Sequence, residues 1–233
     1  MSAIAIVPSA PVLVPELGGA ATAELAELTA AVLAAATLLP PRWIGIGTGG
    51  ADDVIGPDGP NSAGTFAGFG ADLRVGLSPQ TGESGHSPVE LPLCALLAGW
   101  VRGQARPEAA AQVRVYRGDH DALTALARGR QLRAEIDSAP DPIGVLVVAD
   151  GANTLTERAP GGYDPGAADV QLALDDALAD GDVAALTRLP PQIPGRVAFQ
   201  VLAGLIEPGP RTAKELYRGA PYGVGYFAGV WQP

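Results

Sequence analysis

The sequence predicts an α/β fold, a single-domain sandwich in which a central, largely parallel or mixed sheet is flanked by helices. Short β-branched apolar runs alternate along the chain with longer segments of helical periodicity, which is typical of βαβ units. Residues 143–148 form an apolar run between turn residues, as expected of a strand that helices cover on both faces. No internal repeat or linker divides the 233 residues, and a chain of this length can bury a sufficient core without disulfides or metals. We therefore expect one domain over residues 1–233.

The first quarter of the chain contains two expected strands and one helix. Residues 3–7 are a short buried strand, and the prolines of residues 8–15 favour an extended segment because they fix φ. Residues 24–39 carry apolar side chains at helical spacing and end at a proline pair. A second strand at residues 43–47 then opens into a long loop, residues 48–60.

The rest of the chain continues this alternation. Asp121 is a suitable N-cap for a helix, and Pro88 suits the first turn of another. The segment 112–116 alternates as a half-buried strand does. The expected strands are 73–77, 112–116, 143–148 and 222–230, and the expected helices are 87–101, 121–139, a segment around 170–178, and 196–206.

Composition limits the function. The formal charge of −10 and the pI near 4.6 argue against nucleic acid and anionic membranes, because no basic stripe is present and Lys214 is the single lysine. The one cysteine, Cys94, lies in an apolar run and is expected to be a small buried hydrophobe. No basic region precedes the apolar start, and no uncharged apolar run reaches spanning length, so we expect a cytoplasmic protein.

Polar residues directly follow the strand at 143–148. The loop 149–165 would leave the carboxyl end of that strand, where open α/β sheets keep their ligand sites, and the long loop 48–60 opens at the same edge. Asp150 and Asn153 are either a hydrogen-bonding pair directed at a ligand or an Asx turn that stabilises the loop.

Three other patterns each have a functional and a simpler structural interpretation. Residues 45–50 have GxGxxG spacing, but aspartates and prolines follow where a nucleotide-binding helix would begin, which favours an ordinary glycine-rich loop. His86 and His120 are the only histidines, so a non-haem iron site would need both, whereas His120 also suits a turn before the helix cap. Ser9 with His86 and an aspartate would form a hydrolase triad, although no serine lies in a G-x-S-x-G elbow.

Five segments of the chain, taken in order, match a set of known motifs. They are Pro8-Ser-Ala-Pro-Val-Leu-Val-Pro-Glu16, Gly64-Thr-Phe-Ala-Gly-Phe-Gly-Ala71, His86-Ser87 with Glu90-Leu-Pro92, Ala149-Asp-Gly-Ala-Asn-Thr-Leu155 and Tyr222-Gly-Val-Gly-Tyr226. The first segment resembles Pro-His-Pro-Pro-x-x-x-Pro-Glu, and the second resembles Gly-Asp-Phe-x-x-Phe-Gly-Ala. The others are similar to His-Ser-x-Glu-x-x-Leu-Pro, Gly-Asp-x-Ser-His-x-Leu and Phe-Gly-Val-Gly-Tyr. In this order the motifs resemble those of the class III extradiol ring-cleavage dioxygenase family, the LigB-like catalytic subunits and their Memo-like relatives.

The chain departs from this family at the positions that carry its chemistry. The resemblance implies an iron-binding histidine where this chain has Ser9 and a second where it has Gly49. The implied acid/base histidine is Asn153, and an amide cannot transfer a proton near neutral pH. The family's metal carboxylate falls near residues 192–196, where no acid matches it. His86 is the best preserved of the family's functional positions.

These departures lead to one main functional hypothesis and two alternatives. We expect a LigB-like pseudoenzyme that has lost its iron, holds no metal or other cofactor and binds a small molecule or a protein in a polar cleft. The alternatives are an active Fe(II) extradiol dioxygenase for a catechol-type substrate with relocated ligands, and a metal-independent hydrolase using Ser9 and His86. His86, Asn153 and Asp150 are the candidate catalytic residues, and the expected cleft residues are Ser9, Thr48, Gly49, His86, Asp150 and Asn153.

The C-terminal tail bears on self-association. Relatives of the family that the chain resembles are commonly oligomeric, and the apolar tail 222–231 would suit an interface of a homo-oligomer. The same pattern fits an ordinary buried strand, which is the interpretation we favour.

Overall fold

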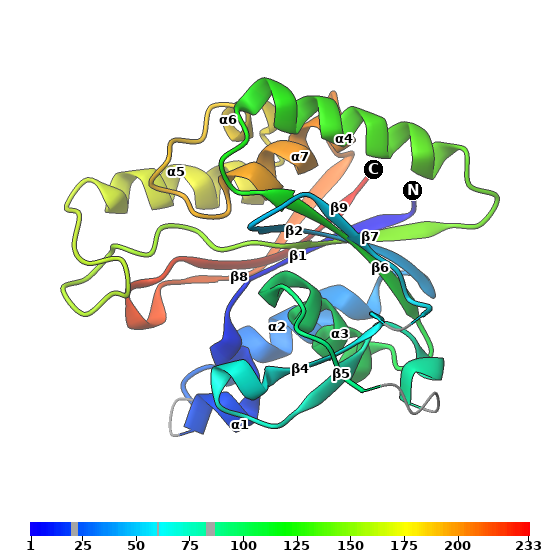
Figure 1. Ribbon diagram of the computed structural model, residues 1–233. Coiled ribbons are helices and arrows are strands. Elements are labelled where there is room, and N and C mark those ends of the chain that lie inside the picture. The colour runs from blue at the N-terminus through cyan, green and yellow to red at the C-terminus, as the bar shows by residue number, and fades with distance from the viewer. Residues whose placement is uncertain (20–22, 60, 83–86) are drawn as a thin grey trace.

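The computed structural model describes residues 1–19, 23–59, 61–82 and 87–233, and a seven-stranded sheet runs through its centre (Figure 1). Four neighbouring strands are parallel, and antiparallel strands flank them at both edges. This mixed sheet confirms the predicted fold class. In spatial order the strands are β3 (Asp53–Ile55), β6 (Ala110–Arg117), β2 (Arg42–Gly49), β7 (Ile143–Val148), β1 (Ala3–Val7), β9 (Tyr226–Gln232) and β8 (Thr212–Gly219).

Strand β7 occupies the centre of this sheet, with exactly the bounds that its apolar run predicts. All six of its residues are buried, and it pairs in parallel with β1 on one side and β2 on the other. Its side chains alternate between the two faces, so that Leu146 and Val148 enter one hydrophobic core and Val145 and Val147 the other. The β-branched side chains therefore serve two helical layers at once.

Helices cover both faces of the sheet (Figure 1). The lower layer also holds a separate two-stranded sheet, and the upper layer is built around α7, a helix that is buried at every position after Arg196. The lower elements are α1 (Pro15–Gly18), α2 (Ala26–Thr37), α3 (Leu93–Ala105), β4 (Ala63–Thr65) and β5 (Arg74–Gly76). The upper helices are α4 (Ala122–Asp137), α5 (Ala167–Asp180), α6 (Val183–Leu186) and α7 (Arg196–Ile206). None of the described helices is long and apolar enough to cross a membrane.

Helix α3 packs closely on β2. A Cβ at Gly47 would lie 2.2 Å from the Cβ of Cys94, so the helix approaches the strand at a position without a side chain. Cys94 is buried, as its apolar surroundings predict, and burial raises the pKa of its thiol to about 12. Gly45, Gly47 and Gly49 thus allow close packing of β2 on its neighbours, whereas a Cβ at Gly50 would meet no atom within 4 Å. The next element is strand β3 and not a helix, so the structural context of a dinucleotide-binding turn is absent here.

Several elements differ from their predictions. Residues 8–15, which were expected to be extended, contain a short 3-10 helix at Pro11–Leu13. Strand β3 interrupts the predicted loop 48–60, and the predicted third strand is β5, which pairs with β4 outside the main sheet. The helix predicted at 87–101 begins at Leu93, because the chain before it is extended and Val89 forms a bridge to Gly64. Pro88 therefore does not lie in a helical first turn.

Both edges of the main sheet contain a strand that the sequence did not indicate. β3 has only three residues, and β8 carries polar and charged side chains along an edge where a strand needs no continuous apolar run. The predicted strand 222–230 begins later, at Tyr226, and lies between β1 and β8. Its residues up to Trp231 are buried within the chain, which agrees with the ordinary-strand interpretation of the tail.

Helices α4 and α7 cross at a pair of glycines. A Cβ on Gly129 of α4 would lie 2.1 Å from the carbonyl oxygen of Val201, and a Cβ on Gly204 of α7 would lie 2.2 Å from that of Leu126. Because backbone occupies both positions, even a methyl group would push the helices apart.

We predict that Gly204→Ala lowers the free energy of unfolding by about 1–3 kcal/mol, the usual cost of overpacking. Gly103→Ala is the matched control, because Gly103 is exposed in α3 and its Cβ would meet no atom within 4 Å. The control should raise stability by about 0.5–1 kcal/mol through helix propensity alone. Urea unfolding of the three proteins measures both effects, and equal stabilities for the two variants would contradict the close crossing.

Candidate functional site

The carboxyl ends of the central parallel strands bring the predicted site residues to one edge of the sheet. Val7 pairs with Val148, and Ile46 pairs with Val147, so β1, β2 and β7 end at nearly the same level. Ser9 and Asp150 each lie two residues beyond the last residue of their strand, and Thr48 and Gly49 end β2. The sheet therefore brings together residues that are far apart in the sequence, as predicted for an open α/β sheet.

One hydrogen bond joins Ser9 to Asp150 across 141 residues of sequence. The backbone N–H of Ser9 donates to Oδ1 of Asp150 at 2.7 Å. Burial raises the pKa of the Asp150 carboxyl to about 7, and the Ser9 N–H opposes that rise because it favours the charged form. Near neutral pH the side chain is thus present in both forms. It accepts hydrogen bonds when charged and can also donate one when protonated.

A phenol lies close to this carboxyl. Tyr226, the first residue of β9, is buried, and burial followed by the charge of Asp150 raises the pKa of its hydroxyl. The phenol consequently keeps its proton at physiological pH. Tyr226 was not identified from the sequence as a site residue, although it closes the segment that resembles Phe-Gly-Val-Gly-Tyr.

The backbone around Asp150 is held by the start of α7. The N–H of Gly195 donates to the carbonyl oxygen of Asp150 at 3.1 Å, and a Cβ on Gly195 would lie 2.5 Å from that oxygen. Position 195 therefore needs glycine for this close approach. The resemblance places the family's metal carboxylate at residues 192–196, and the backbone there does contact the Asp150 loop.

A buried glutamine holds the next part of the loop. Oε1 of Gln171 accepts from the Ala152 N–H at 2.7 Å, and its Nε2 donates to Oδ1 of Asp175 at 2.8 Å. Burial raises the pKa of Asp175 to about 6, and the bond from Gln171 lowers it. Sequence reasoning missed Gln171, but its position three residues before the buried Leu174 marks it as a polar residue on the inner face of α5.

Asn153 contacts its own loop. Its carbonyl oxygen accepts from the Gly161 N–H at 2.9 Å, and its Oδ1 would lie 2.5 Å from a Cβ on Gly161. These contacts favour the interpretation in which Asn153 stabilises the loop over the one in which it faces a ligand.

The other end of the edge has little room for side chains. A Cβ on Gly49 would lie 2.6 Å from Cγ1 of Val115, while Thr48 beside it is partly exposed. An imidazole at position 49 would have to displace Val115. The residues present therefore do not fit the iron site of the family that the chain resembles, since position 9 offers a backbone N–H to Asp150 and position 49 has no space for a ligand.

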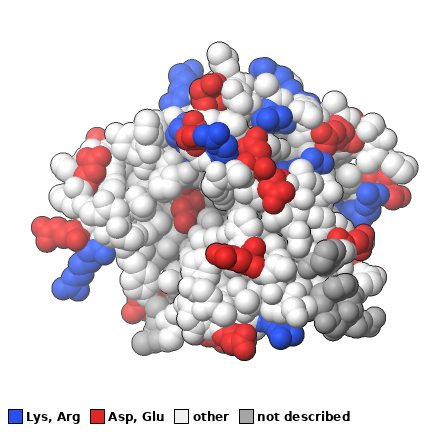
Figure 2. Space-filling view, viewed as in Figure 1, with Lys and Arg blue, Asp and Glu red and all other residues white. Residues whose placement is uncertain are grey.

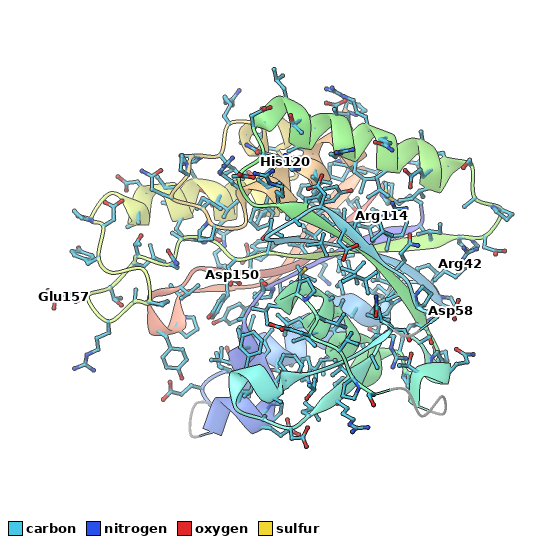
Figure 3. All side chains as sticks on the ribbon, in the orientation of Figure 1. Arg42, Asp58, Arg114, His120, Asp150 and Glu157 are labelled. Atoms are coloured by element: carbon cyan, nitrogen blue, oxygen red, sulfur yellow. The ribbon has the colours of Figure 1, made fainter. Side chains whose placement is uncertain are left out.

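His120 does not extend this site. His86 lies outside the described residues. His120 precedes α4, and its Nε2 lies 2.7 Å from Oδ1 of Asp52, away from Asp150 (Figure 3). Asp121 caps α4 by accepting from the Thr124 N–H at 2.8 Å, as predicted. Within the described part of the chain, no three His, Cys, Asp or Glu side chains gather as a metal site would require.

Comparisons with known proteins give information about the fold of this chain and none about the chemistry of the site. No protein-family model matches the chain, and no curated protein matches it. The crystal structure of an uncharacterized protein from Escherichia coli K12 superposes with a TM-score of 0.57 at 11% sequence identity, covering 99% of this chain and 100% of that one. This likeness shows a shared fold.

The raised pKa of Asp150 makes a prediction about stability. Between about pH 4, where an ordinary aspartate ionises, and about pH 7, the folded protein keeps a proton that the unfolded chain has released. Raising the pH through this range therefore lowers the free energy of unfolding. The free energy of unfolding can fall by at most about 1.4 kcal/mol per pH unit through this one group, and partial exposure of the Asp150 side chain reduces that value.

Asp150→Asn removes this proton but keeps an oxygen for the Ser9 N–H. We expect the variant to gain stability relative to the wild type as the pH rises from 5 to 7.5. Denaturant unfolding of both proteins across this range measures the difference, in which the titration of all other groups cancels. A difference that stays constant with pH would show that Asp150 titrates normally.

Proposed function

We propose that this chain is a metal-free protein of the LigB-like type that binds a small polar molecule at the Asp150 edge of the sheet. The observation that carries the proposal is the Asp150 carboxyl itself. It sits at the carboxyl end of the central strand with a pKa of about 7, and the Ser9 N–H is its only hydrogen-bond partner among the described residues. Perturbed carboxyls at such positions are typical of binding and active sites.

The arrangement favours a ligand with hydroxyl groups. The free lone pairs of the Asp150 carboxylate accept hydrogen bonds, and the nearby Tyr226 hydroxyl keeps its proton. A catechol-type diol is the ligand class that the family resemblance suggests. Supporting the non-catalytic role, Ser9, Gly49 and Asn153 replace the histidines that this family uses for iron binding and proton transfer.

Catechol is a direct probe of this proposal. We expect saturable binding at pH 8, followed by NMR titration, because the carboxylate is then ionised and accepts from a hydroxyl. Asp150→Asn should weaken binding by about tenfold or more, the effect of losing one charged hydrogen bond. Asp180→Asn is the matched control, since Asp180 is exposed at the end of α5. At pH 5.5 the two proteins should bind alike, because Asp150 is protonated.

Iron loading tests the proposal that the protein holds no metal. Protein prepared with Fe(II) under anaerobic conditions should retain no stoichiometric iron on metal analysis, and should take up no oxygen with a panel of catechols. Retained iron that is lost in His86→Ala or His120→Ala, together with a yellow ring-opened product, would instead establish the dioxygenase with relocated ligands.

A second candidate function uses the same carboxyl as a general acid and base without metal. The pKa of about 7 favours this role, because a group that is half protonated at the working pH both takes and returns protons. Conversion of a bound ligand without iron or oxygen, lost in Asp150→Asn, would distinguish catalysis from binding. The hydrolase alternative requires Ser9 with His86, and only Ser9 lies in the described part of the chain.

A further inference from the structure

A second polar cavity lies between α4 and the strand pair β3–β6, and none of its lining residues belongs to the Asp150 site. Its volume is about 400 Å³, within the range of small-molecule sites. Figure 2 shows acidic and basic side chains interleaved over α4 and the strands beneath it. The lining residues from which we argue are Asp52, Arg114, Tyr116, Arg128, Leu132 and Glu135.

The cavity exists because α4 packs against α7. The glycine crossing draws α4 toward α7, and α7 itself covers β2 and β7 at the centre of the sheet. The outer strand β6 is left with less cover on this face. Arg114 and Tyr116 of β6 alternate with the buried Val113 and Val115 and lie on the face of the strand toward α4. Figure 3 labels Arg114 on this face.

Helix α4 supplies the opposite wall. Arg128, Gln131, Leu132 and Glu135 follow one another at spacings of three, one and three residues, which places them on one helical face. That face is mostly polar although it lies over a strand, where a helix usually buries apolar side chains. The cavity is therefore lined by hydrogen-bonding groups from both sides.

The carboxylates in this lining already have partners. Asp52 accepts from the Arg117 N–H at 2.8 Å and lies 2.7 Å from His120 Nε2, and Arg128 Nη2 donates to it at 3.2 Å. Glu135 accepts from Arg114 Nη2 at 2.7 Å and from Gln131 at 3.4 Å. These acceptors are largely used within the protein.

The donors, in contrast, are incompletely used. Nε of Arg114 is buried and has no hydrogen-bond partner among the described residues, which is a costly state for a charged donor. Tyr116 is only 8% exposed, and its hydroxyl has no partner in the described part of the chain. Burial raises the pKa of this phenol to about 12, so it keeps its proton to donate. Arg128 adds guanidinium nitrogens beyond the one that contacts Asp52.

We propose that this cavity binds a small organic monocarboxylate, whose oxygens accept from Tyr116 and from Arg114 or Arg128. Val54, Leu132 and the ring of Tyr116 provide apolar walls for the body of such a ligand. A single charge suits the site better than a dianion, because three carboxylates, those of Asp52, Asp53 and Glu135, share the lining with the two guanidiniums.

Benzoate is the test probe, because it combines one carboxylate with a flat apolar ring. Calorimetric or NMR titration of the full chain should show saturable binding of benzoate but not of benzamide, its uncharged analogue. Arg128→Gln and Tyr116→Phe should each weaken benzoate binding, the first by about tenfold or more. Arg133→Gln is the matched control, because Arg133 lies on the same helix outside the cavity and pairs with Asp137. It should bind benzoate as the wild type does.

Thermal unfolding of each variant checks that the fold is kept, and Tyr116→Phe retains the buried ring. Absence of saturable benzoate binding would overturn the proposal, as would equal binding by Arg128→Gln and the wild type. Equal affinity for benzamide would show that charge is not recognised, and preference for inorganic phosphate would exclude the monocarboxylate class. Each of these outcomes leaves the Asp150 proposal untouched, since that site is probed with catechol and Asp150→Asn.

Discussion

The double parallel pairing of β7 is the constraint on which the rest of the structure depends. Because β1 and β2 bond to opposite edges of one fully buried strand, their order, direction and level are fixed together. The strand must then be covered on both faces, which divides the helices into two layers with separate cores. The chain leaving β7 emerges beside the chain leaving β1, and the bond between Asp150 and Ser9 is the direct result.

That placement puts a carboxyl where its charge is poorly solvated. The surrounding loop is not free to relax away from it, since Gly195 bonds the Asp150 carbonyl and Gln171 bonds the Ala152 N–H. The raised pKa of Asp150 thus depends on the loop that holds the residue as well as on the residue itself. An asparagine there would keep an oxygen for the Ser9 N–H without the cost of a buried charge, and the acid at this position is the basis of the binding role that we propose.

The sequence predicted the parts of this structure that depend on local pattern. The apolar run of β7 and the Asp121 cap of α4 were readable because burial and capping impose residue types at fixed spacing. The edge strands β3 and β8 were not, since a strand that faces solvent imposes no such pattern. Ser9 and Asp150 were predicted to share an edge, whereas Tyr226 and Gln171 join Asp150 through tertiary packing that no local spacing encodes.

The two candidate sites lack opposite kinds of hydrogen-bonding partner. At the Asp150 edge an acceptor has too few donors, and in the cavity under α4 the donors Arg114 and Tyr116 have too few acceptors. A ligand of the opposite kind would supply the missing partner at each of these two proposed sites. The glycine crossing joins α4 to α7, and the N–H of Gly195, just before α7, donates to the carbonyl oxygen of Asp150. The packing of two helices thus shapes both sites, while the chemistry of each is decided by its own unpaired groups.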